Sequence, residues 1–326
     1  MSKVVIGVDL GGTNARAAVV TPEGKLLSRD SRATNAADGP EAVMAAMEAS
    51  IDAALQEAGM TRADVLSGAI GAPGPLNWQT GVVYTPPNLP GWNNVPLADL
   101  MTKRMGFPVF VENDANVACY GEYWSGAARG AETVCLLTLG TGVGGGLVVF
   151  GKLVRGIDGT AAETGHVCVV RDGRQCNCGA KGCIEAYASV TGMVRTAVEG
   201  IEAGKKTILT EMCGGDLSKL TGKMISDAVE QGDDFAKWVM TETGIYLGTA
   251  IGSLINLLNP EKVVLYGGMT AAGDALLNPI RETALKQSFE VPGKRAQIVL
   301  AELGGDAGVI GAAGCAYQRW QDSQGK

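Results

Sequence analysis

The N-terminal stretch VVIGVDLGGTNARAAVV, residues 4–20, decides the fold class. Its apolar runs at 4–8 and 17–20 predict two buried strands, and the glycine-containing residues between them predict a tight turn. The stretch TVCLLTLGTGVGGGLVVF, residues 133–150, repeats this order with strands at 133–139 and 146–150 around a glycine loop. Two copies of a strand–turn–strand unit predict a chain made of two similar halves.

The remaining segments alternate between strand and helix patterns. Strands are predicted to begin at 25 and to span 65–70, 108–112 and 263–266, and helices to span 40–58, 96–105, 233–258, 274–286 and 306–320. This alternation indicates an α/β protein. We expect a smaller α/β domain from residues 1–115 plus 306–326, onto which the last helix packs, and a larger one from 116–305. A cleft is expected between the two.

Composition excludes several classes of protein. The 326 residues carry a formal net charge of −7, from 27 basic and 34 acidic side chains, which argues against a sequence-independent grip on nucleic acid. The N-terminus enters a strand at once and lacks the layout of a signal peptide. Residues 243–260 are uncharged, but polar residues and glycines interrupt them, so they predict a buried helix and no membrane span. We expect a cytoplasmic protein with no nucleic-acid or membrane partner.

The glycine loops indicate phosphate chemistry. Residues 140–145 match G-x-G-x-x-G, but a strand-like run follows where a dinucleotide-binding fingerprint needs a helix, and no P-loop spacing occurs. Glycine turns are often ordinary hairpin structure. Two glycine turns in equivalent positions of the two halves, with a glycine pair after a third predicted strand, favour a nucleotide-binding cleft. The candidates are Gly11 and Gly12 for close backbone approach, Thr13, Asn14 and Arg16 for contacts, Asp9 for a divalent cation, Thr141 and Gly142 in the second loop, and the pair Gly267 and Gly268.

One histidine and three cysteines crowd together. His166, the single histidine, precedes Cys176, Cys178 and Cys183, which together form a Cys₃His set typical of a closed structural zinc site. The alternative is a chance grouping of cysteines in a turn. A closed shell leaves no open position, so this zinc is not expected to activate water. The other five cysteines, Cys119, Cys135, Cys168, Cys213 and Cys315, are expected to be small buried hydrophobes.

The glycine turns resemble those of the actin-like ATPase architecture shared by sugar kinases, Hsp70 and actin. That resemblance implies that the two hairpins clasp the phosphates of ATP and that Gly267 and Gly268 border the adenosine. The cluster at 163–185 resembles the signature of the ROK family, Glu-x-Gly-His followed by Cys-x-Cys-Gly-x-x-Gly-Cys-x-Glu, and the chain is most similar to its glucokinase branch. Further matching motifs are 9–13, 73–75, 88–92 and 112–116.

Asp114 has two interpretations from the residues alone. It follows a predicted strand and starts a predicted helix, so it fits a helix N-cap and a general base for a substrate hydroxyl about equally well. The family resemblance favours the base. It also implies that Asn113, Glu163, His166 and Glu185 hydrogen-bond the sugar, although exposure is the usual state of a glutamate. Gly74 and Asn88 are further candidates for the substrate wall.

The resemblance thus implies an ATP- and Mg²⁺-dependent hexose kinase that phosphorylates the 6-hydroxyl of glucose and forms a dimer or tetramer. The residues leave open a different sugar (N-acetylmannosamine, N-acetylglucosamine, fructose or allose) and polyphosphate as the donor. The alternative outside the enzymes is a regulator that binds a sugar and does not catalyse a reaction. It is disfavoured because Asp114 is present and the chain opens directly on the first predicted strand.

Overall fold

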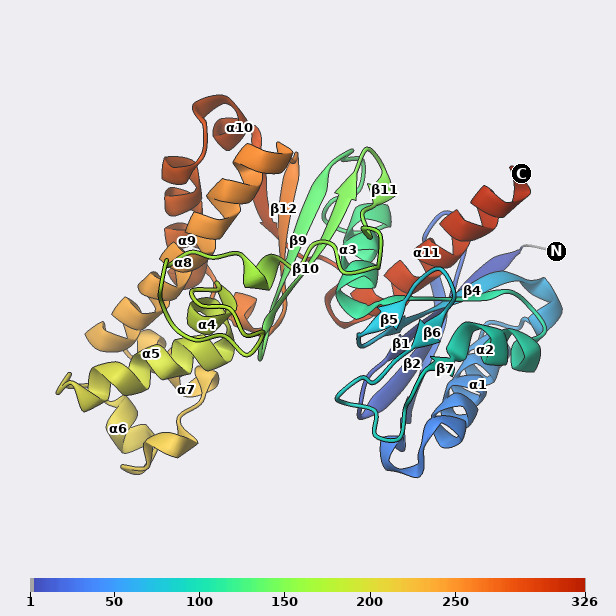
Figure 1. Cartoon of the computed structure of the whole chain (residues 1–326), viewed down its shortest axis with the longest axis horizontal. Helices are drawn as coiled ribbons and strands as arrows, with labels where there is room; N and C mark the ends of the chain where they lie inside the picture. Colours follow the sequence, from blue (N-terminus) through green and yellow to red (C-terminus); the bar gives the residue numbers. More distant parts are fainter. Residues whose placement is uncertain (1–2, 326) are drawn as a thin grey trace. The chain divides into compact units, whose positions relative to one another are not determined.

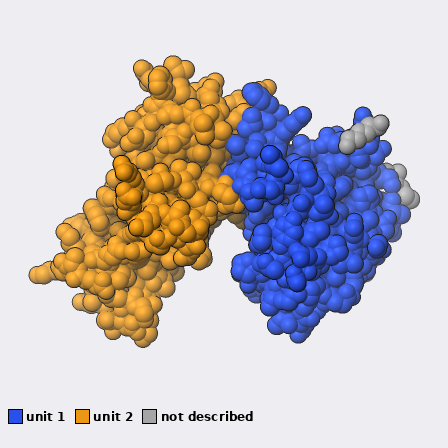
Figure 2. Space-filling model, in the orientation of Figure 1, with its two compact units in different colours: residues 1–131, 146–162, 301–326 blue, residues 132–145, 163–300 orange. Residues whose placement is uncertain are grey.

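A computed structural model describes residues 3–325 as two compact units (Figures 1 and 2). Unit 1 comprises Met1–Ala131, Gly146–Ala162 and Ala301–Lys326, and unit 2 comprises Glu132–Gly145 and Glu163–Leu300. Compared with the expected ranges, unit 1 also takes in the segments around helix α3 (Asp114–Trp124) and strand β11 (Lys152–Leu153). Helix α3 belongs there because it packs along helix α11 (Ala307–Gln324) of the same unit.

Unit 1 is built on a five-stranded sheet of order β3-β2-β1-β4-β8. Its strands are β1 (Val4–Leu10), β2 (Asn14–Val20), β3 (Leu26–Ala33), β4 (Val65–Ala72) and β8 (Val109–Asn113). β1, β2 and β3 are antiparallel neighbours, whereas β1, β4 and β8 run parallel. A small antiparallel sheet, β5 (Leu76–Asn77), β6 (Val82–Val83) and β7 (Val95–Pro96), completes the unit.

Alternation along β1 explains how helices cover both faces of this sheet. Val4, Ile6, Val8 and Leu10 pack in one core with helices α1 (Pro40–Glu57) and α2 (Leu97–Met105). Val5 faces the other way and packs against α11. Gly7 lies on that second face, where a Cβ would come within 1.8 Å of the Val309 carbonyl oxygen. This glycine therefore lets α11 approach the strand closely.

Unit 2 contains parallel strands β9 (Val134–Leu139), β12 (Lys262–Tyr266) and β13 (Gln297–Leu300). Strand β10 (Val143–Val149) starts in this unit and ends in unit 1, where Val148 and Val149 pair with β11. It starts three residues before the predicted 146, so Gly144 and Gly145 lie in the strand and the turn is confined to residues 140–142. The helices of this unit are α4 (Glu185–Ala188), α5 (Val190–Glu202), α6 (Leu209–Met212), α7 (Gly222–Glu230), α8 (Asp234–Leu258), α9 (Asp274–Gln287) and α10 (Glu290–Arg295).

Short 3₁₀ turns complete the chain at Ala36–Asp38, Arg62–Asp64, Thr164–His166, Leu217–Lys219, Gly268–Ala272 and Gly304–Asp306. The uncharged run at 243–260 lies mostly within α8 and packs against α9, as expected for a buried helix. Within residues 3–325, the structure contains no helix with the length and apolar character needed to cross a membrane. The predicted α/β class, with sheets covered by helices, is confirmed.

Candidate functional site

The first glycine turn joins β1 to β2 in unit 1. Gly11 N donates to Asn14 O at 2.9 Å, and the Thr34 hydroxyl donates to Gly11 O at 2.7 Å, which fixes the turn from outside. A Cβ on Gly12 would lie 3.1 Å from Asn88 O, so the turn packs closely beside the predicted substrate-wall residue Asn88. Thr13 and Asn14 are exposed at its tip. The structure thus brings the first predicted phosphate loop and Asn88 together.

Asp9 and Arg16 face each other across the hairpin. They are paired in register, and Asp9 Oδ2 lies 3.4 Å from Arg16 Nη2. Burial raises the pKa of Asp9 above its ordinary value, and the Arg16 charge partly opposes that rise. The Asp9 side chain keeps 24% of its surface exposed. A carboxylate oxygen with an open side is a ligand that suits Mg²⁺, so Asp9 fits the predicted cation role.

The junction of β8 and α3 settles which residue caps the helix. The Asn113 side chain accepts from Ala115 N at 3.0 Å and from Asn116 N at 3.2 Å, so Asn113 is the N-cap. Asp114 is the first residue of the helix, with Oδ1 accepting from Ala115 N at 2.8 Å. The interpretation of Asp114 as a simple N-cap is therefore wrong. A Cβ on Gly74 would lie 3.8 Å from Asn113 Nδ2, which places the Gly74 turn beside this junction.

The surroundings of Asp114 favour a proton acceptor. The residue is exposed to solvent on one side, while protein atoms crowd the rest of its carboxylate. Loss of hydration raises its pKa above the ordinary value of 3.8, hydrogen bonds such as that from Ala115 N oppose the rise, and the Asp9 carboxylate adds to it. A carboxylate with a raised pKa is a better general base than an ordinary aspartate.

The second glycine turn lies in unit 2 and is held by Glu185. Gly140 N donates to Gly142 O at 3.0 Å, and Glu185 Oε2 accepts from Val143 N at 3.0 Å. A Cβ on Gly142 would come within 2.5 Å of Glu185 Oε2, so the glycine permits this contact. Glu185 is half-buried, unlike an ordinary surface glutamate. A groove of 280 Å³ joins these residues; its lining includes Thr141, Gly142, Cys176, Glu185, Ser189 and Arg195.

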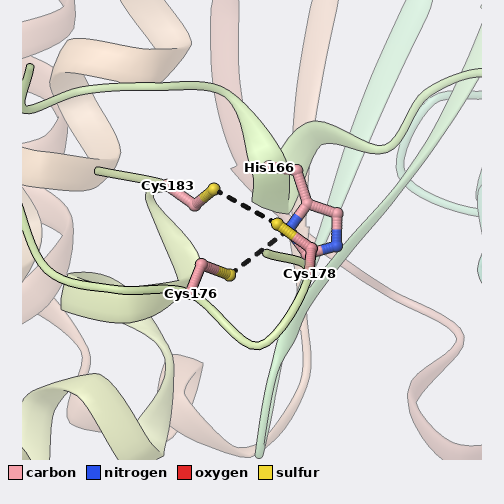
Figure 3. Close-up of side chains that lie close together, drawn as sticks. All are labelled: His166, Cys176, Cys178 and Cys183. Carbon is pink, nitrogen blue, oxygen red and sulfur yellow. Dashed lines mark hydrogen bonds between the residues drawn. The ribbon is translucent and has the colours of Figure 1, made fainter. Parts of the chain in front are cut away.

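The predicted metal ligands converge at one point of unit 2 (Figure 3). One donor atom from each of His166, Cys176, Cys178 and Cys183 lies within 4.8 Å of all the others. The sulfur atoms of Cys178 and Cys183 are 3.7 Å apart, and Cys176 Sγ is 3.7 Å from His166 Nδ1. A tetrahedron with zinc–sulfur bonds of about 2.3 Å has edges of about 3.8 Å, so these four donors fit zinc.

Short-range geometry explains this convergence. The segment from Arg174 to Gly182 folds back on itself, with Cys176 N donating to Ala180 O at 2.9 Å and Gly182 N to Arg174 O at 2.8 Å. Because Nδ1 of His166 faces the sulfur atoms, its Nε2 points away from the cluster (Figure 3). Glu163 is exposed at the start of the 3₁₀ turn that carries His166.

One cysteine departs from the expected burial. Cys119, Cys135, Cys213 and Cys315 are buried, as predicted for small hydrophobes, but Cys168 is exposed. Its place explains the difference, because it forms an isolated bridge with Cys183 beside the loop from Arg174 to Gly182, where no core covers it. The prediction of a buried Cys168 is therefore wrong.

Gly267 and Gly268 differ sharply in what surrounds them. Gly267 has a φ of 119°, and a Cβ there would lie 2.4 Å from Leu139 O, whereas a Cβ on Gly268 would meet nothing within 4 Å. Gly268 borders a cavity of 420 Å³. The other walls come from α5, α7, α8 and the 3₁₀ turn after β12, and include Val190, Met193, Lys223, Met240 and Met269. Sequence reasoning missed these walls because they are scattered apolar and polar helix residues without a motif.

This contrast gives a stability prediction. Gly267→Ala is expected to lower the free energy of unfolding by about 2–4 kcal/mol, because it combines backbone strain with a steric clash. Gly268→Ala is the matched control and is expected to change it by less than about 0.5 kcal/mol. Urea unfolding followed by circular dichroism measures both. Equal effects of the two substitutions would contradict the described backbone.

Comparisons with known proteins agree with this architecture. The family model described as "ROK family" matches residues 5–319. A protein named glucokinase from Halalkalibacterium halodurans is 40% identical over 94% of this chain and 92% of its own length. A glucokinase from Thermotoga maritima is 39% identical over 97% of this chain and 98% of its own.

A solved structure shows the same fold. The crystal structure of a ROK family glucokinase from Streptomyces griseus, in complex with glucose and AMPPNP, is 39% identical and covers 97% of this chain and 99% of its own, with a TM-score of 0.77. The predicted fold class, that of the actin-like ATPases, is confirmed by this match. The chain belongs to the ROK family.

Proposed function

We propose that this protein is an ATP-dependent hexose kinase of the glucokinase type, which transfers the γ-phosphoryl group of ATP to the 6-hydroxyl of glucose. The relatives named glucokinase, at 39–40% identity over nearly the whole chain, support this substrate. The related structure in complex with glucose and AMPPNP supports ATP as the donor. The observation that best supports this reaction is the raised pKa of Asp114, whose solvent-accessible carboxylate lies in the first turn of α3. With the single histidine assigned to zinc, this aspartate is the best placed general base in unit 1.

Asp114 accepts the proton of the 6-hydroxyl as that oxygen bonds to the γ-phosphorus, while the bond from the γ-phosphorus to the bridging oxygen breaks and ADP leaves. Asn113 and the backbone around Gly74 and Asn88, all in unit 1, contact the sugar. Buried polar groups that pair only with the right hydroxyls discriminate strongly among sugars. The N–H groups and side chains of residues 11–14, with Arg16, bind phosphate oxygens. Asp9 would hold Mg²⁺, which would neutralise negative charge during phosphoryl transfer.

Residues of unit 2 complete the proposed roles. His166 ligates zinc through Nδ1 and donates or accepts a sugar hydrogen bond through Nε2, and Glu163 and Glu185 add carboxylate acceptors. The Cys₃His set would hold zinc, which would fix the imidazole in place and supply no chemistry on the substrate. Thr141 and Gly142 bind phosphate at the second turn, near the N-terminus of α5. The cavity beside Gly268 takes the adenosine.

A panel of sugars and donors tests this function. ADP release is measured with glucose, fructose, allose, N-acetylglucosamine and N-acetylmannosamine, and glucose is tested with ATP and with polyphosphate. We expect kcat/KM to be highest for glucose with ATP. A higher value for another sugar would move the assignment to that sugar. Binding of sugars without ADP release would favour a non-catalytic regulator.

The raised pKa of Asp114 gives a pH prediction. The base works only when deprotonated, so kcat/KM is expected to fall tenfold per pH unit below the apparent pKa of the acid limb. Because loss of hydration raises the pKa of Asp114, that limb is expected above the ordinary aspartate value of 3.8. A profile of kcat/KM against pH measures it, with tryptophan fluorescence at each pH to confirm folding. An acid limb at or below 3.8 would contradict this role.

A further inference from the structure

A buried ion pair lies directly beside the proposed base. Arg155, in the loop after β11, donates through Nε to Glu112 Oε2 at the carboxyl end of β8. Only 12% of the Arg155 side chain and 4% of the Glu112 side chain are exposed. Both residues belong to unit 1. Because the pair is so deeply buried, removal of either side chain would leave the other with a buried charge and no counter-charge.

Glu112 connects this pair to both sides of Asp114. Its Oε1 accepts from Asn113 N at 3.1 Å and from Asn116 Nδ2 at 3.0 Å. Asn113 is the residue whose side chain caps α3. One carboxylate therefore holds the residue before Asp114 and a residue in the first turn after it, while its other oxygen is held by Arg155.

Aromatic stacking fixes Arg155 from the far side. Its guanidinium carbon lies 4.7 Å from the centre of the Trp78 ring, and that of Arg319 lies 5.4 Å from the centre of the same ring. Arg319 Nη1 also donates to Trp78 O at 2.7 Å, which ties the tryptophan to helix α11. Arg155 is thus held by the hydrogen bond from its Nε to Glu112 and by the Trp78 ring stacked on its guanidinium group.

We propose that Arg155 is a positioning residue for the base Asp114, acting through Glu112. Without the guanidinium, the buried Glu112 carboxylate is left unpaired and turns toward water, and it releases Asn113 N or Asn116 Nδ2. The start of α3 then shifts, and Asp114 shifts with it. Proton transfer is sensitive to displacements of about 1 Å, whereas sugar binding is spread over many contacts. This inference rests on the proposed kinase function.

The test is a kinetic split on full-length protein with glucose and ATP. Arg155→Met is expected to lower kcat about 30-fold while KM for glucose stays within about threefold. The double variant Glu112→Gln/Arg155→Met is expected to recover most of kcat, because a neutral amide oxygen still accepts from Asn113 N and leaves no unpaired charge. Arg155→Lys keeps the charge and is expected to fall between wild type and Arg155→Met.

Arg62→Met is the matched control. Arg62 is also ion-paired in unit 1, but its partners Glu48 and Asp52 lie on helix α1, and kcat is expected to stay unchanged. Rates are divided by the folded fraction from circular dichroism; if Arg155→Met fails to fold, Arg155→Lys must still lower kcat at constant KM.

A kcat for Arg155→Met or Arg155→Lys equal to that of wild type would overturn the proposal, as would a double variant no faster than Arg155→Met. An inactive wild type would instead contradict the kinase function itself, and the role of Arg155 with it.

Discussion

Asp114→Asn is expected to lower kcat by about 10³-fold while leaving the Kd for glucose within about threefold. Asparagine has the same size and keeps an oxygen that accepts from Ala115 N, the contact that Asp114 makes at 2.8 Å. It has no basic oxygen to receive the proton of the 6-hydroxyl. The helix start should persist, because Asn113 supplies the cap. The change therefore removes the base with little other disturbance.

Two measurements separate chemistry from binding. A coupled assay follows glucose-dependent ADP formation, and calorimetry gives the Kd for glucose. Asp114→Ala is expected to abolish turnover in the same way, with sugar binding still measurable. Asp99→Asn is the matched control, since Asp99 lies in the first turn of α2 in the same unit. Turnover of Asp114→Asn near the wild-type rate would remove Asp114 from the role of base.

Cys178→Ser is expected to remove zinc and most of the activity together. Wild-type protein should contain about one equivalent of zinc per chain, and the variant less than about half an equivalent, because a hydroxyl is a poor replacement for a thiolate. Loss of the ion frees the imidazole of His166 and the loop from Arg174 to Gly182. We expect kcat/KM for glucose to fall at least about tenfold, and the melting temperature to fall as well.

Two further variants separate the effect of losing zinc from the effects of changing nearby side chains. Cys168→Ser changes an exposed cysteine at the edge of the loop that is outside the ligand set, so zinc content and activity should both stay unchanged. His166→Cys offers a Cys₄ set, which still holds zinc, but it removes Nε2 from the proposed sugar contact. It should therefore keep zinc and lose glucose affinity. Full activity in zinc-free Cys178→Ser would contradict the proposed role of the metal.

The parts of the site that the sequence predicted are local in the chain. The four proposed zinc ligands fall within residues 166–183, so their spacing alone constrains them to meet. Asp9 and Arg16 face each other because a short hairpin sets the register. The contact of Arg155 with Glu112 spans 43 residues and depends on how separate segments pack, which no spacing reveals. The cap at Asn113 escaped prediction because adjacent Asn and Asp residues both suit an N-cap.

The glycines also divide into those that local sequence predicts and those that depend on packing between distant segments. The 47 glycines point to turns and ligand loops, and Gly12, Gly142 and Gly267 indeed allow close contacts there. Others lie in helix interiors, where turn chemistry does not apply. Gly244, Gly248 and Gly252 are spaced by four along α8, and a Cβ at each would collide with α9. These serve helix packing, which a reading based on turns does not anticipate.

The product of the wild-type reaction tests the central claim most directly. Purified protein is incubated with glucose, ATP and Mg²⁺, and the phosphorus NMR spectrum is followed with time. We predict equal amounts of ADP and of a hexose monophosphate esterified at the 6-hydroxyl, and neither product when glucose is omitted. Absence of any sugar phosphate with glucose and with every other hexose in the panel would contradict the assignment of this protein as a hexose kinase.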